Sequence, residues 1–147
     1  MSVIQEIEDL CTSNDTRLRT ATVSYDKYLK LFDFNTNKVT HMVKEDTPLI
    51  CLDWCQTDSN FIAYGSEGGD WILRDLRMID TPLRRESFGP KNPVRKIAFA
   101  PYKDSKVIGI GSDVLYFYNV ALFLYSSSAH PINNHHFSSI DNLVILS

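Results

Sequence analysis

The sequence predicts an all-β fold, because a short signature recurs along the chain and apolar and polar side chains alternate within the repeats. Asp9-Leu10-Cys11 is followed 44 residues later by Asp53-Trp54-Cys55, and Ala98-Phe99-Ala100 comes 45 residues after that. Alternation is clearest from Leu29 to Phe34, which has the two-residue period of a half-buried strand. We therefore expect about three copies of one β-unit within the 147 residues.

A second signature recurs at nearly the same spacing along the chain. Phe32-Asp33, Arg74-Asp75 and Tyr118-Asn119 lie 42 and 44 residues apart. A serine precedes each of them: Ser24, Ser66 and Ser112. A period of about 40–45 residues is that of four-stranded propeller blades, whereas common helical repeats are nearer 33–34 residues. The predicted fold class is all-β, a partial β-propeller of about three four-stranded antiparallel blades with a non-repeat C-terminal tail.

The period places the blades at about 3–44, 45–88 and 89–125. Strands of the second blade are expected at 49–55, 61–66, 71–76 and 83–87, with turns containing glycine or proline between them. Strands of the third blade are expected at 94–100, 106–112, 114–119 and 121–125. The first blade begins with a strand within 3–11, for which a short helix capped by Ser2 and Gln5 is the alternative.

The repeat resembles the WD-repeat family, whose blades run from a Gly-His pair through an apolar strand to a Ser-x-Asp turn and a Trp-Asp pair. Gly89-Pro90 and Phe99-Ala100-Pro101 match the first half of this pattern in the third unit. Ser24-Tyr25-Asp26 and Phe32-Asp33 match the second half in the first unit. The resemblance covers residues 3–119 and implies a non-catalytic scaffold that binds proteins or peptides.

The resemblance also assigns structural roles. In the family, a serine, a buried aspartate and a histidine form a hydrogen-bonded set, which a buried carboxylate needs. Here the set is incomplete, because Pro90 stands at the histidine position, Gly68 at the turn aspartate and Arg74 at the tryptophan. The residues expected to carry the repeat signature are Ser24, Asp26, Asp33, Trp54, Ser66, Asp75, Gly89, Phe99 and Ser112.

Composition limits the function. The chain is 44% apolar and 22% charged, which is typical of a globular domain. Its net charge of -3 comes from 15 basic and 18 acidic side chains, so no basic field favours nucleic acid. We expect no secretory signal, no membrane span and, with three cysteines, a reducing compartment. The expected location is the cytoplasm, with traffic to the peroxisome or nucleus.

No catalytic, metal or cofactor site is expected. Cys51 and Cys55 are four residues apart on one strand, roughly 13 Å at about 3.3 Å per residue, so we expect core side chains and not zinc ligands. His135 and His136 are adjacent, and on an extended chain they would point to opposite faces. A serine elbow, a phosphate loop and a dinucleotide fingerprint are all missing from the sequence. An enzyme is therefore not expected.

The candidate partner-binding residues lie in predicted loops at one end of the blades, which is where propellers present binding surfaces. Their acidic excess would suit a basic peptide, and ordinary solvated loops are the alternative. These candidates are Asp26, Glu45, Asp46, Glu67 and Asp70.

Arg77 is a further candidate. Asp75-Leu76-Arg77 resembles the adaptor-docking motif of ubiquitin-ligase substrate receptors, in which the arginine makes a bidentate contact. An arginine packed over its own blade edge is the alternative.

A narrower resemblance concerns three segments, 50–55, 74–77 and 94–102. Read in this order, they are similar to successive blades of a cytosolic import receptor for type two peroxisomal targeting signals.

Three blades cannot close a ring, since propellers use about 4–8. We therefore expect missing blades, another chain that completes the ring, or a truncated product with no independent function. Composition changes at the tail 120–147, which has six serines, three of the four histidines and a single acidic residue, Asp141. This tail is either the degenerate start of a fourth blade or sequence that does not belong to the propeller.

Overall fold

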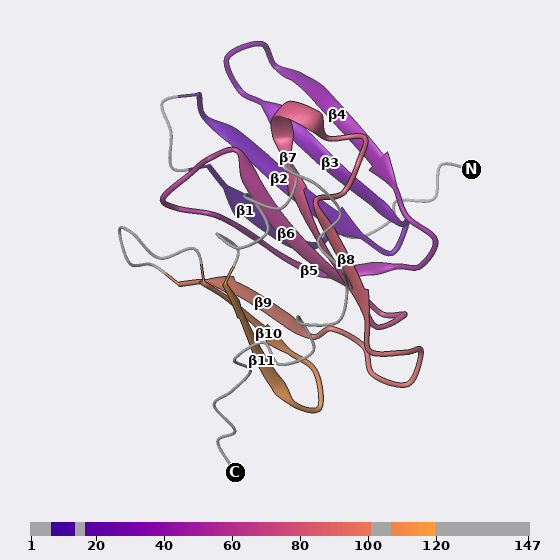
Figure 1. Cartoon of the computed structure of the whole chain (residues 1–147). Helices are drawn as coiled ribbons and strands as arrows, with labels where there is room; N and C mark the ends of the chain where they lie inside the picture. Colours follow the sequence, from indigo (N-terminus) through magenta and orange to yellow (C-terminus); the bar gives the residue numbers. More distant parts are fainter. Residues whose placement is uncertain (1–6, 14–16, 101–106, 120–147) are drawn as a thin grey trace, which may run out of the picture.

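The structure, a computed structural model, describes residues 7–13, 17–100 and 107–119. These residues form three antiparallel sheets, each made of consecutive strands, and the sheets follow one another through space in chain order (Figure 1). A single 3-10 turn, Leu76–Met78, accompanies them. No helix within these described ranges has the length and apolar character needed to cross a membrane.

The first sheet has the order β1 (Ile7–Thr12), β2 (Arg19–Ser24), β3 (Tyr28–Asp33) and β4 (Lys38–Lys44). The second has β5 (Leu49–Trp54), β6 (Phe61–Ser66), β7 (Asp70–Asp75) and β8 (Arg84–Ser87). The third has β9 (Lys96–Phe99), β10 (Val107–Gly111) and β11 (Leu115–Asn119). The all-β prediction is confirmed, and the fold is that of a partial WD-type β-propeller.

Differences from the predicted strands are confined to their ends. The first strand runs over Ile7–Thr12, so its described part is a strand and not a helix. The expected strand at 94–100 is shorter, Lys96–Phe99, and the N–H of Val94 bonds instead to the carbonyl of Ser66 in the second sheet. The strand expected at 121–125 and the tail 120–147 lie outside the described residues.

Apolar side chains from alternate strand positions fill two cores, one on each side of the second sheet. The core shared with the first sheet is built around Trp54, Tyr64 and Leu29, all completely buried. The core shared with the third sheet is built around Trp71 and Ile108. The second sheet is therefore apolar on both faces, and five of the six residues of β7 are buried.

The sheet register corrects the alignment of the first signature. The residues three positions before Ser24, Ser66 and Ser112 are Ala21, Ala63 and Gly109. Each of them pairs with a residue on the first strand of its own sheet. Their partners are Cys11, Asp53 and Ala98. Cys11, not Asp9, is thus the counterpart of Asp53. Structurally equivalent residues of the first and second sheets are 42 residues apart. The similar tripeptides that begin at Asp9 and Asp53 are 44 residues apart, so aligning them misplaces the repeat by two residues.

Candidate protein-binding end

The loops that connect the strands at one end of the three sheets form a continuous belt, which we call the loop end. It comprises residues 24–28, 44–49, 66–70, 87–96 and 111–115. Main-chain hydrogen bonds join one loop to the next: Glu45 N to Lys27 O (2.9 Å), Glu67 N to Pro48 O (2.9 Å), Phe88 N to Gly69 O (2.9 Å) and Arg95 N to Gly111 O (2.8 Å). The loop end is thus held as one surface by backbone contacts.

Serine side chains stabilise this belt. Ser24 Oγ accepts the N–H of Asp26 at 3.2 Å, and Ser66 Oγ accepts that of Asp70 at 3.0 Å. Ser112 Oγ donates instead to the carbonyl of Pro93, at 3.0 Å. The three serines therefore bond to the backbone of the loop end.

Glycine is required where two of these loops meet. Gly69 has φ +88, and a Cβ there would lie 2.2 Å from the carbonyl oxygen of Gly89. Gly89 itself has φ +87, but a Cβ on it would meet nothing within 4 Å. A side chain at position 69 would force the turn of the second sheet away from the loop that leads into the third sheet.

Tyr25 and Glu67 lie together on the exposed side of the loop end. The Tyr25 side chain is 45% exposed, and its Oη donates to Glu67 Oε1 at 3.4 Å, which joins the turns of the first and second sheets. The negative charge of Glu67 raises the pKa of Tyr25 above its ordinary value. Asp46 is also exposed on this surface. Sequence reasoning missed Tyr25, because its contact with Glu67 depends on packing between sheets.

Other acidic candidates already have partners within the chain. Asp26 forms an ion pair with Lys30 Nζ at 2.5 Å and accepts the N–H of Tyr28 at 2.9 Å. Burial raises the pKa of Asp26, but these bonds outweigh it and hold the pKa below its usual value. Asp70 is half-buried, 3.6 Å from Arg85 Nη1. Both carboxylates contribute to the local structure of their turns.

Glu45 was expected on an exposed loop, and the structure buries it. Its side chain is only 5% exposed and contacts Arg74, Arg85 and Tyr64. The side chain of Glu45 is therefore not presented to a partner.

Arg77 lies apart from the other candidates, at the opposite end of β7 from the loop end. Its side chain is 62% exposed, and Nε and Nη2 bind the carboxylate of Asp75 at 2.9 and 2.6 Å. Its guanidinium also lies over the ring of Phe61, 5.8 Å from the centroid. Hydrogen bonds from Arg77 lower the pKa of Asp75 below its usual value. The arginine thus packs over its own sheet while remaining accessible.

The remaining signature residues have structural partners. Asp33 accepts the N–H of Asn35 at 2.8 Å and so closes the turn into β4. Trp54 is completely buried and donates from Nε1 to Ser59 O at 2.9 Å. Phe99 lies in the core between the second and third sheets. Both signatures thus mark the residues that hold sheets and turns together.

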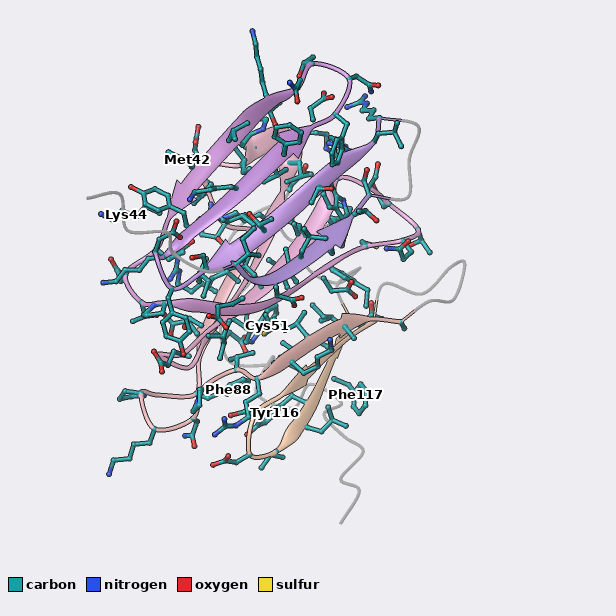
Figure 2. All side chains as sticks on the ribbon, turned by 180° about the vertical axis from the view of Figure 1, so that it is seen from behind. Met42, Lys44, Cys51, Phe88, Tyr116 and Phe117 are labelled. Atoms are coloured by element: carbon teal, nitrogen blue, oxygen red, sulfur yellow. The ribbon has the colours of Figure 1, made fainter. Side chains whose placement is uncertain are left out.

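The cysteines occupy interior positions. Cys51 and Cys55 are buried, and Cys51 Sγ lies 3.1 Å from the carbonyl oxygen of Val94 (Figure 2). Burial raises the pKa of the Cys51 thiol to about 12, so it stays protonated at neutral pH. Among the described residues, histidine, cysteine and acidic side chains do not gather in a group that could hold a metal ion.

Three repeated sheets packed face to face, with serine-bonded turns gathered at one end, are the features of WD-type propeller blades. No protein-family model matches the chain. Protein NEDD1 of Mus musculus and of Homo sapiens is 33% identical over 90 residues, which are 61% of this chain and 13% of that protein. DNA damage-binding protein 2 of Gallus gallus is 32% identical over 68 residues, 46% of this chain and 13% of that protein.

Both relatives are WD-repeat proteins, and the similarity supports the WD-repeat family for this chain. The matched segment spans only 13% of the length of each relative. What the whole relatives do is therefore not transferred to this chain by the match.

Proposed function

We propose that the chain is part of a non-catalytic WD-type scaffold that binds a protein or peptide at its loop end. The observation that carries this proposal is the belt of loops, which is fixed by main-chain hydrogen bonds yet presents Tyr25, Asp46 and Glu67 to solvent. A fixed surface loses little conformational freedom on binding, which favours affinity. WD-repeat relatives fit a scaffold role.

The ligand we propose is a basic segment. The carboxylates of Glu67 and Asp46 would attract its charge, and the ring face of Tyr25 could receive an arginine or lysine side chain. Binding of this kind at an exposed surface is strongest at low salt.

Fluorescence anisotropy with a labelled arginine-rich peptide tests this proposal. Glu67→Lys with Asp46→Lys should abolish binding, whereas Asp80→Lys, an exposed carboxylate outside the loop end, should leave most of it. Equal affinity of the two variants would reject the loop end as the site.

The finer version is a receptor for type two peroxisomal targeting signals, and it rests on the sequence segments 50–55, 74–77 and 94–102. Neither relative named above carries that role in its name. A labelled peptide bearing the type two signal should then bind more tightly than a scrambled peptide of the same charge. Equal binding of the two peptides would remove this version and leave the general scaffold proposal intact.

A second candidate function is a substrate receptor of a ubiquitin ligase, which docks an adaptor through Arg77. The observation that favours it is the exposed guanidinium, held in place by Asp75 at the end away from the loop end. Arg77→Ala should abolish co-purification with the adaptor while the loop-end peptide still binds. An unchanged adaptor yield would dismiss this function.

A further inference from the structure

A buried charge cluster lies where the first and second sheets meet, and its centre is Glu45. Glu45 Oε1 accepts Tyr64 Oη at 2.5 Å and Arg74 Nη2 at 2.8 Å, while Oε2 pairs with Arg85. The side chains of Glu45 and Arg74 are only 5% and 4% exposed. Both carboxylate oxygens are thus satisfied inside the protein, as a buried charge requires.

Arg74 uses all three of its guanidinium nitrogens in this cluster. Besides Glu45, it donates from Nε to Tyr64 Oη at 2.6 Å and from Nη1 to Ile79 O at 2.5 Å. Burial alone would lower the pKa of Arg74, but these bonds keep its pKa above the ordinary value. A buried arginine that lost its carboxylate would carry an uncompensated charge, which is strongly destabilising.

The repeat explains why these two residues meet. In the third unit, Pro90 occupies the expected histidine position, three residues before Pro93. Glu45 occupies the same position in the second unit, three residues before Pro48. Arg74 stands in β7 where the resemblance places a tryptophan. An ion pair therefore occupies, in the second unit, the two positions at which the WD pattern has histidine and tryptophan.

The cluster joins β8 and the 44–49 connection to the two central strands of the second sheet. It contacts Tyr64 on β6, Arg74 on β7 and Arg85 on β8, and the backbone N–H of Glu45 bonds to Lys27 O in the first sheet. No residue of β8 is fully buried, so this strand has little core of its own. Strand β8 is therefore held mainly by its backbone pairing with β7 and by the ion pair of Arg85 with Glu45.

We propose that Glu45 and Arg74 form a charge lock that fastens β8 and the 44–49 connection to the second sheet. The lock replaces the hydrogen-bonded set of the WD pattern in this unit. When Glu45 is neutralised, Arg74 and Arg85 lose their shared partner, and the segment from Ile79 to β8 loosens first. The strands β5 and β6 retain their apolar core, so the change begins at the outer edge of the second sheet.

Amide hydrogen exchange of the full chain tests the lock. Glu45→Gln keeps the shape of the side chain and should speed exchange in 79–87 at least about tenfold, with a smaller change in β5. Glu86→Gln is the matched control, because Glu86 pairs with Arg84 on the same strand at a more exposed site. Equal effects of the two variants on 79–87 would overturn the proposal.

A double variant keeps the proposal testable if Glu45→Gln fails to fold. Glu45→Met with Arg74→Met removes both charges while keeping similar volume, which is often neutral for a buried ion pair. The double variant should therefore show a higher midpoint of thermal unfolding than either single methionine variant. If the double variant is less stable than both single variants, the two residues do not act as a pair and the lock is rejected.

Discussion

The two outer faces of the three-sheet stack carry different side chains. On the first sheet, one cross-strand row that points away from the second sheet consists of Leu10, Thr22, Lys30 and Met42, and its apolar members Leu10 and Met42 are 53% and 59% exposed. On the third sheet, the corresponding face lines a hollow of about 320 Å³. The residues around this hollow are Lys96, Ala98, Phe99, Ala100, Gly109, Gly111, Leu115 and Phe117. The outer face of the first sheet therefore mixes polar and large apolar side chains, whereas that of the third sheet is mostly apolar and hollowed.

Residues on the apolar outer face of the third sheet correspond to residues of the second sheet that a neighbouring sheet covers. By register, Leu115 corresponds to Trp71 and Phe117 to Leu73. Trp71 and Leu73 are completely buried against the third sheet, whereas Leu115 is 39% exposed. Figure 2 shows Phe117 on the side of the third sheet away from Tyr116, which stacks on Phe88 at 4.5 Å.

The outer face of the third sheet has the composition of a face that another blade covers, because Leu115 and Phe117 stand where the second sheet has the buried Trp71 and Leu73. This supports the proposal that further blades, from the same polypeptide or another chain, complete the propeller on that side.

The largest expected effect is on the covered face. Leu73→Ala should lower the free energy of unfolding by about 2–5 kcal/mol, because it leaves a cavity in a closed core. Phe117→Ala removes a larger side chain but should cost no more than about 1 kcal/mol, because its site is already open to solvent. Urea unfolding of both variants measures the contrast. Equal losses would mean that the two faces are equally covered.

The next effect concerns the contact between the second and third sheets at the loop end. Gly69→Ala should cost about 1–3 kcal/mol, because it combines a positive φ with a collision against Gly89 O. Gly89→Ala has the same φ without the collision and should cost less. Thermal unfolding of the two alanine variants separates strain from steric conflict. If Gly89→Ala is the more damaging, the close approach does not matter.

The open face of the third sheet should contribute to self-association. Phe117→Ser should reduce binding of a hydrophobic dye and any concentration-dependent dimerisation, because it makes the open face polar. Thr22→Ser, on the outer face of the first sheet, is the control and should change neither. Dye fluorescence and sedimentation velocity provide the measurement. An unchanged dye signal with Phe117→Ser would show that the hollow is not the exposed apolar site.

The smallest effect is a pH dependence at the contact between sheets. Asp53 Oδ2 accepts the N–H of Phe99 at 2.7 Å, and burial raises the pKa of Asp53 above its ordinary value of 3.8. A raised folded-state pKa gives stability that is present below the unfolded pKa and lost as pH rises through the folded pKa. Relative to Asp53→Asn, the natural chain should therefore be most stable in acid. Urea unfolding at several pH values between 3 and 7 measures this difference. A difference that grows with pH would contradict it.

The all-β class, the three repeats and the tight-turn serines could be predicted because period and turn chemistry are local properties of sequence. The burial of Glu45 could not be, because its partners Tyr64, Arg74 and Arg85 are brought together only by the packed second sheet. The register of β1 also escaped prediction, because Asp9 and Asp53 look equivalent in the sequence but pair with Val23 and Ala63, which lie at different distances from the turn serines. Tyr25 was missed for the same kind of reason, as its neighbour Glu67 belongs to another sheet.

Amide hydrogen exchange of the unmodified chain tests the central claim, which is that the second sheet is closed on both faces while the third is closed on one. Amides of β6 and β7 should exchange only through global unfolding, and those of β11 should exchange faster through partial opening. Uniformly fast exchange, with no cooperative transition, would contradict this account and favour a truncated product without an independent fold.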